Sequence, residues 1–229
     1  MLVMEKVTKT YPHRRGTVPA LDGACVTIRR GEFVSLVGPS GSGKSTLLLM
    51  LGGMLSPTSG RVLLDGQSLY DLDANARARL RKERVGFVFQ TFNLVPYLTA
   101  MENVQVPLYL AGRERPEQEE RARELLERVG LADRLDHKPC ELSVGQQQRV
   151  ALARMLANNP QVILADEPTG NLDPETGQQI IRFLEEFHEE GRTVVMVTHD
   201  PRAAKRARRT LQLEHGKIVG DRAHALHVA

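Results

Sequence analysis

The chain has 229 residues, of which 41% are hydrophobic and 26% charged, and its formal net charge is +3 at pH 7. These values are typical of a globular protein with one sizeable core, and they argue against a disordered chain or a strongly basic protein. The longest nearly apolar run, Leu47–Leu55, is too short to span a bilayer, and charge appears too early for a secretory leader, so we expect a cytoplasmic chain that reaches a membrane only through a partner.

Two segments near the N-terminus, Leu2–Thr10 and Cys25–Arg29, alternate apolar and polar residues. This alternation predicts half-exposed antiparallel strands and therefore a small β layer. Five later segments are short apolar runs separated by helical patterns, which is typical of a mainly parallel sheet covered on both faces. These runs are Phe33–Gly38, Val85–Phe89, Val162–Ala165, Thr193–Val197 and Thr210–Leu213. The sequence thus predicts an open α/β core.

A glycine-rich stretch, Gly38–Thr46, follows the first apolar run and fits G-x-x-x-x-G-K-[ST]. Glycines let backbone N–H groups curl around phosphates, Lys44 can reach the β/γ-phosphate charge, and the Ser45 hydroxyl can ligate Mg²⁺. The helix that follows points its positive end at the same anion. We predict nucleoside triphosphate binding by Gly38, Ser40, Gly41, Ser42, Gly43, Lys44, Ser45 and Thr46.

Between Thr99 and Asn158 no strand pattern appears. Pro116–Val129 and Gln146–Ala157 instead carry apolar residues at helical spacing. The sequence therefore predicts a helical subdomain at about residues 91–159, inserted into a single domain whose core and β layer comprise residues 1–90 and 160–229.

Three of the apolar runs lead to groups that can do chemistry at the carboxyl edge of the sheet. Gln90 offers an amide that can ligate Mg²⁺ or position water. Asp166 can hold hydrated Mg²⁺, and Glu167 can orient and deprotonate an attacking water. His199 could contact the γ-phosphate, although a lone histidine is more often structural. We predict Glu167, His199 and Gln90 as catalytic residues, with Mg²⁺ held by Ser45, Gln90 and, through water, Asp166.

A basic segment follows His199 and comprises Arg202, Lys205, Arg206, Arg208 and Arg209. Such a segment could contact nucleic acid or an anionic leaflet, but it also fits the solvated face of a helix. Because no aromatic residues for base stacking are interleaved with it, we expect no nucleic-acid partner.

Further motifs complete a resemblance to the ATP-binding-cassette family. Leu142–Arg149 is similar to that family's signature motif, and Asn171–Asp173 to its D-loop. Gln90, His199 and Tyr11 correspond to its Q-loop, its H-loop and its adenine-stacking aromatic residue. The resemblance implies a P-loop NTPase fold of the cassette type, with ATP and Mg²⁺ as ligands and ATP hydrolysis as the activity. Tyr11 either stacks on adenine, which we favour, or packs on the edge of the β layer.

The resemblance also implies that ATP joins two copies head to tail, each nucleotide lying between the phosphate loop of one copy and the signature motif of the other. Ser143, Gly145 and Gln146 would then contact the γ-phosphate in trans, and Asp173 would take part through the D-loop. Val144 departs from the family pattern, which usually has glycine there. If the loop requires positive φ, we expect this β-branched residue to weaken ATP-driven closure without abolishing it.

Four short stretches of sequence resemble those of ATPases in the lipoprotein-releasing and macrolide-exporter group. They lie at residues 86–94, 98–104, 165–173 and 197–201. That group implies a homodimer on the cytoplasmic face of the inner or plasma membrane, bound to an integral-membrane permease. The work would be lipoprotein release, efflux or mechanotransmission, or else regulation of a signalling or cell-wall-hydrolysis complex without transport.

The apolar residues after Gln90 would contact the permease's coupling helix by the same resemblance, or would fill the core of the helical subdomain. They are Phe92, Leu94, Tyr97 and Leu98. Two other classes of protein share the phosphate loop. A small-molecule kinase would not need the signature and D-loop motifs, and a DNA-repair cassette normally carries a long coiled coil, whose heptads are missing between Thr46 and Leu142.

Overall fold

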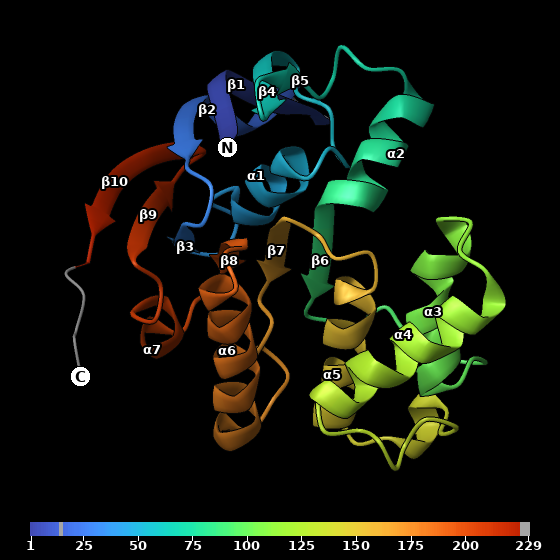
Figure 1. Ribbon diagram of the computed structural model, residues 1–229. Helices are drawn as coiled ribbons and strands as arrows, with labels where there is room; N and C mark the ends of the chain where they lie inside the picture. Colours follow the sequence, from blue (N-terminus) through green and yellow to red (C-terminus); the bar gives the residue numbers. More distant parts are fainter. Residues whose placement is uncertain (14–15, 225–229) are drawn as a thin grey trace.

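The computed structural model describes residues 1–13 and 16–224, and it contains two sheets (Figure 1). The smaller sheet is antiparallel, with strand order β2-β1-β4-β5. Its strands are β1 (Leu2–His13), β2 (Gly16–Ile28), β4 (Ser59–Leu64) and β5 (Gln67–Ser68). The predicted β layer is confirmed, and both of its first strands are longer than their alternating segments.

The larger sheet has six strands in the order β10-β9-β3-β8-β7-β6. Its strands are β3 (Phe33–Val37), β6 (Val85–Phe89), β7 (Val162–Asp166), β8 (Thr193–Val197), β9 (Arg209–Glu214) and β10 (Lys217–Ala223). All are parallel except β10, which pairs antiparallel with β9. The five predicted apolar runs are all strands of this sheet.

One helix, α1 (Lys44–Leu51), lies between the two sheets (Figure 1). Four of its eight residues are buried, and they join the apolar side chains of the β layer and of one face of the large sheet in a single core. The buried residues are Leu47, Leu48, Met50 and Leu51. This packing fixes the start of α1, and therefore the glycine-rich loop before it, against both sheets.

The other face of the large sheet is covered by helices, which share a second core with it (Figure 1). They include α6 (Pro174–Glu189) and a group of three helices that pack on one another, α3 (Ala100–Leu110), α4 (Arg115–Arg128) and α5 (Val144–Leu156). The short helix α7 (Pro201–Ala204) follows β8, the 3-10 turn Pro139–Glu141 precedes α5, and α2 (Ala74–Arg84) precedes β6. The predicted α/β fold with a helical insertion is confirmed.

A buried amide holds the segment between β6 and α3 in place. Asn103 is fully buried, and its Oδ1 accepts from Val95 N at 2.8 Å. Its Nδ2 lies 2.9–3.1 Å from the carbonyl oxygens of Val95, Leu98 and Thr99. One side chain thus satisfies most of the polar backbone groups of this turn, which is required of groups that lose contact with water.

We expect Asn103→Leu to lower the free energy of unfolding by about 2–3 kcal/mol, because it leaves several backbone groups of this turn without a partner in the core. Urea denaturation followed by circular dichroism measures the change as a shift in midpoint at unchanged slope. Gln105→Leu, a half-buried position on the same helix, is the matched control and should change stability by less than about 0.5 kcal/mol. Equal effects of the two substitutions would show that the amide does not hold the turn.

Candidate functional site

The phosphate loop, Gly38–Thr46, is shaped by two glycines that pack against neighbouring backbone. Gly38 has φ 154° and Gly43 has φ 103°, values that favour glycine. A Cβ on Gly38 would lie 2.1 Å from the carbonyl oxygen of Leu213 in β9, and one on Gly43 would lie 2.2 Å from that of Ala20 in β2. Neither position can carry a side chain unless a strand moves.

Lys44 is the first residue of α1, and its side chain folds back over the loop. Its Nζ donates to the carbonyl oxygens of Gly38 and Pro39, each at 2.9 Å. The first helical hydrogen bond runs from Leu47 N to Gly43 O, so the N–H groups before it point out of the helix end. An ammonium group and a helix N-terminus thus face the same loop, an arrangement suited to phosphate.

The serines of the loop differ in accessibility. Ser40 is exposed, and Ser45 is exposed at the start of α1. Ser42 is only 3% exposed, and its Oγ has no hydrogen-bond partner within residues 1–13 and 16–224. Its backbone N donates to Pro39 O at 3.2 Å, and its backbone O accepts from Gly216 N at 3.0 Å. The side chain of Ser42 is therefore buried inside the loop, and its predicted contact with nucleotide stays a prediction.

Asp166 ends β7 beside this loop. The hydroxyl of Ser45 donates to its Oδ1 at 3.1 Å, which brings together two of the residues predicted to hold Mg²⁺. Burial raises the pKa of Asp166, and the nearby charge of Glu167 acts in the same direction, while Ser45 and Lys44 oppose it. Because burial makes ionisation of this carboxylate costly, a nearby cation would stabilise its charged form. Hard oxygen donors of this kind suit Mg²⁺.

Glu167 has left-handed backbone, with φ 48°, and its N donates to Val197 O of the neighbouring strand at 3.0 Å. Its carboxylate is 17% exposed, whereas the side chain of His199 is 71% exposed. Glu167 Oε2 lies 2.8 Å from His199 Nδ1 and accepts from the backbone N of His199 at 3.3 Å. The sheet edge therefore brings together the predicted base and the predicted histidine.

Gln90 follows β6 at the same edge, one residue after Phe89, which pairs with Asp166. Its side chain contacts the D-loop, Asn171–Asp173, through Asn171. Asp173 itself caps α6, because its Oδ1 accepts from Glu175 N at 3.1 Å and Thr176 N at 3.0 Å. The side-chain hydrogen bond from Thr176 is the main reason why the pKa of Asp173 is lowered. The trans contact predicted for Asp173 stays a prediction.

The signature segment, Leu142–Arg149, begins α5 with a capping box. Ser143 Oγ accepts from Gln146 N at 3.2 Å, and Gln146 Oε1 accepts from Ser143 N at 2.9 Å. Gly145 packs against α6, since a Cβ there would lie 2.5 Å from Thr176 Cγ2. The core residues of α5 and those of α1 lie on opposite faces of the large sheet. Helix α5, which begins in the signature segment, and helix α1, which follows the phosphate loop, therefore pack on opposite faces of that sheet.

Val144 is the first residue of α5 and is 47% exposed. It is not among the described residues with positive φ. The structure therefore shows helical backbone at Val144, and its predicted effect on closure stays a prediction.

Tyr11 lies in β1, where it pairs with Val18 of β2. Its ring is 40% exposed, and the Lys9 amine lies 5.3 Å from the ring centroid. Two positions further along β2, Ala20 contacts Gly43 of the phosphate loop. The ring is thus available for stacking near the loop, and adenine stacking stays a prediction.

One residue of this region was not predicted. Arg154 of α5 donates to the carbonyl oxygens of Asn93 at 2.5 Å and Phe92 at 2.6 Å. Both acceptor residues have left-handed backbone, with φ 52° and 54°. Burial lowers the pKa of Arg154. No sequence pattern reveals this contact, because its partners are backbone carbonyls 61 and 62 residues away.

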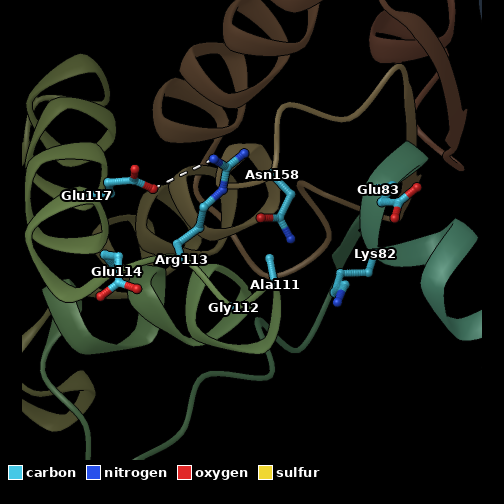
Figure 2. Close-up of a pocket in the computed structure, with 8 residues that line it drawn as sticks. All are labelled: Lys82, Glu83, Ala111, Gly112, Arg113, Glu114, Glu117 and Asn158. Atoms are coloured by element: carbon cyan, nitrogen blue, oxygen red, sulfur yellow. Dashed lines mark ion pairs between the residues drawn. The ribbon is translucent and has the colours of Figure 1, made fainter.

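Other hollows lie away from the phosphate loop. Figure 2 shows one between α2, the end of α3 and the start of α4, with mixed charge. Arg113 and Glu117 lie 3.7 Å apart there, and Lys82 donates to Leu110 O at 2.8 Å. A second hollow, of about 730 Å³, runs beside the D-loop and His199 along α6 and α7. Within the described residues, acidic, histidine and cysteine side chains form no cluster of three or more that could hold a metal.

Comparisons with known proteins agree with this geometry. Residues 21–170 match the family described as ABC transporter. The macrolide export ATP-binding/permease protein MacB of Hyphomonas neptunium is 47% identical over 96% of this chain and 34% of its own length. The ABC transporter ATP-binding protein YvrO of Bacillus subtilis is 46% identical over 98% of this chain and 100% of its own. The chain thus spans about a third of the length of the MacB relative.

Solved structures of the cassette MJ0796 are also similar. A dimeric post-hydrolysis state bound to ADP and Pi has a TM-score of 0.92 and 44% identity, covering 99% of this chain and 100% of that one. Another dimeric structure of the same cassette has a TM-score of 0.93 at 45% identity and the same coverage. Family match, relatives and fold agree along almost the whole chain, and the protein therefore belongs to the ABC transporter family as an ATP-binding cassette.

Proposed function

We propose that this chain binds ATP with Mg²⁺, hydrolyses it, and thereby drives a separate membrane permease. The observation that carries the proposal is the meeting of the phosphate loop, the Ser45–Asp166 pair and the Glu167–His199 pair at one edge of the large sheet. Phosphate binding, metal binding and water activation are the three functions that hydrolysis of a nucleotide requires.

The residues have distinct roles in this proposal. Lys44 and the N-terminus of α1 bind the phosphates. Glu167 takes the proton of the attacking water, and His199 holds that carboxylate and faces the γ-phosphate. Ser45, Gln90 and, through water, Asp166 would hold Mg²⁺, which would neutralise charge on the phosphates. The loop also fits the nucleotide because its glycines leave the backbone open to a close anion.

A second copy completes the site. Helices α1 and α5 pack on opposite faces of the large sheet, so we expect a nucleotide in the phosphate loop to meet Ser143, Gly145 and Gln146 of another molecule. The MJ0796 cassette, which is dimeric with ADP and Pi bound, supports this arrangement. ATP held between two copies favours the closed dimer by its extra affinity for that state, and hydrolysis reverses it.

The partner is an integral-membrane permease. In the MacB relatives, the ATP-binding and permease functions are named together for one longer chain, whereas YvrO has the length of this chain. No helix among the described residues is both long and apolar enough to cross a bilayer. We therefore place the chain on the cytoplasmic face of a membrane through a separate permease, where it works in lipoprotein release, efflux or mechanotransmission, or regulates a complex without transport.

The permease would contact the segment after Gln90. Tyr97 is 84% exposed there, whereas Leu94 packs on the core of the large sheet and the helices. Of the residues predicted for docking, Tyr97 thus offers the largest free surface, and Leu94 contributes to the fold.

We expect Glu167→Gln to form a dimer in the presence of ATP, because loss of the base blocks hydrolysis but leaves nucleotide binding intact. Light scattering after chromatography would give twice the 25.5 kDa of one chain with ATP and one chain without it. ATP turnover should fall by at least about 100-fold. Glu186→Gln, on the exposed side of α6, is the control and should keep wild-type turnover. Unchanged turnover in Glu167→Gln would contradict its role as the base.

We expect Lys44→Ala to weaken ATP binding by about ten- to a hundredfold, the effect of losing charge-assisted hydrogen bonds to phosphate. Isothermal titration calorimetry with ATP measures the affinity. Lys82→Ala removes a lysine from the hollow of Figure 2, away from the loop, and should leave the affinity unchanged. Equal affinities for the two variants would mean that the loop does not bind the phosphates through Lys44.

A further inference from the structure

Gln90 and Asn171 form a reciprocal pair of hydrogen bonds between the end of β6 and the D-loop. Gln90 Nε2 donates to Asn171 Oδ1 at 3.2 Å, and Asn171 Nδ2 donates to the backbone oxygen of Gln90 at 3.0 Å. The two residues are 81 positions apart in the sequence, so the contact joins two separate loops at the sheet edge.

The pair fixes the orientation of both side-chain amides. A backbone carbonyl can only accept, so Asn171 must turn its NH₂ group towards Gln90 O. Its Oδ1 then faces the Gln90 side chain, where only an NH₂ group can donate to it. This leaves Gln90 Oε1 directed away from Asn171, and among the described residues no hydrogen-bond donor reaches that oxygen. Oxygen is the amide atom that binds a hard cation.

Gly170, the residue before the D-loop, leaves the space that Gln90 occupies. A Cβ built on Gly170 would lie 2.9 Å from Gln90 Nε2 and 3.2 Å from its Cδ. The backbone of Gly170 does not have the positive φ that favours glycine. A side chain at this position would therefore require the Gln90 amide to move, while the backbone conformation would not oppose it.

The backbone after Gln90 is held from the other side. Arg154 of α5 donates to the carbonyl oxygens of Phe92 and Asn93, which keeps this turn against the helix. With the backbone fixed in this way, the remaining freedom of Gln90 lies in its side chain, and Asn171 is the residue that removes it.

We propose that Asn171 is a positioning residue that turns the amide oxygen of Gln90 towards the metal of the nucleotide site. This inference rests on the proposed role of Gln90 as a ligand of Mg²⁺. Without Asn171 the Gln90 side chain can adopt other rotamers, most of which do not present its oxygen to the metal, and this weakens metal binding but leaves the phosphate loop unchanged. Partners that orient a metal ligand typically change metal affinity by about ten- to a hundredfold.

The test measures Mn²⁺ binding in the presence of ATP by electron paramagnetic resonance, since Mn²⁺ shares the oxygen ligands of Mg²⁺. All variants carry Glu167→Gln so that nucleotide is not consumed. Gln90→Ala should weaken Mn²⁺ affinity by at least about tenfold, and Asn171→Ala by about tenfold. The double variant should bind Mn²⁺ as Gln90→Ala does, because Asn171 acts only through Gln90.

Gly170→Ala gives a second, independent test, because its Cβ displaces the Gln90 amide while Asn171 stays in place. It should weaken Mn²⁺ affinity in the presence of Gln90 and have no effect in Gln90→Ala. Gln178→Ala, which removes an amide from α6 beside the D-loop, is the matched control and should have no effect. Thermal unfolding of each variant confirms that the fold is intact.

The outcomes separate this inference from the proposed function. If Gln90→Ala weakens Mn²⁺ binding but Asn171→Ala does not, or if their effects add in the double variant, the positioning role is wrong while the metal role of Gln90 stands. If Gln90→Ala leaves Mn²⁺ affinity unchanged, Gln90 is not a metal ligand, and both the metal role and the inference are overturned.

Discussion

Close contact between the phosphate loop and two strands is the constraint on which the rest of the site depends. Gly38 touches the backbone of β9 and Gly43 touches that of β2, at distances that leave no room for a Cβ. Since β2 belongs to the small sheet and β9 to the large one, the loop is held in the angle between them, with α1 packed behind it. The positions of Lys44 and Ser45 follow from this, because both begin a helix that cannot shift without opening one of the sheets.

The parallel strands place polar and charged side chains at the sheet edge beside that fixed loop. Residues at the carboxyl ends of neighbouring parallel strands lie along one edge, so Gln90, Asp166 and His199 are placed at the same edge although they are far apart in sequence. Glu167 shows that this edge is also strained, because its left-handed backbone turns the carboxylate towards His199. Such strain persists only where surrounding structure holds it, here through the hydrogen bond from Glu167 N to β8.

Much of this arrangement could be predicted from the sequence. The remaining features could not be predicted, for physical reasons. The buried strands are apolar runs with polar groups at their ends, so both the sheet and its functional edge can be deduced. Helix α2 carries a sequence so polar and so little buried that periodicity gives no signal, and Pro107 interrupts the pattern of α3. The contacts of Arg154 and Asn171 are with backbone carbonyls distant in sequence, and no spacing rule reveals such partners.

The capping box of the signature segment decides which hydrogen-bonding groups this segment leaves free. In its capping box, the Ser143 hydroxyl and the Gln146 amide each use an oxygen as acceptor for a backbone N–H. What remains on these side chains is the donor of each group, the hydroxyl hydrogen and the amide NH₂. The helix start that carries them adds its own positive end. Stabilising α5 therefore leaves hydrogen-bond donors at the start of a helix that packs on the face of the sheet opposite α1. In the proposed dimer these donors would meet a phosphate bound by the other copy, and the affinity for nucleotide would then drive association.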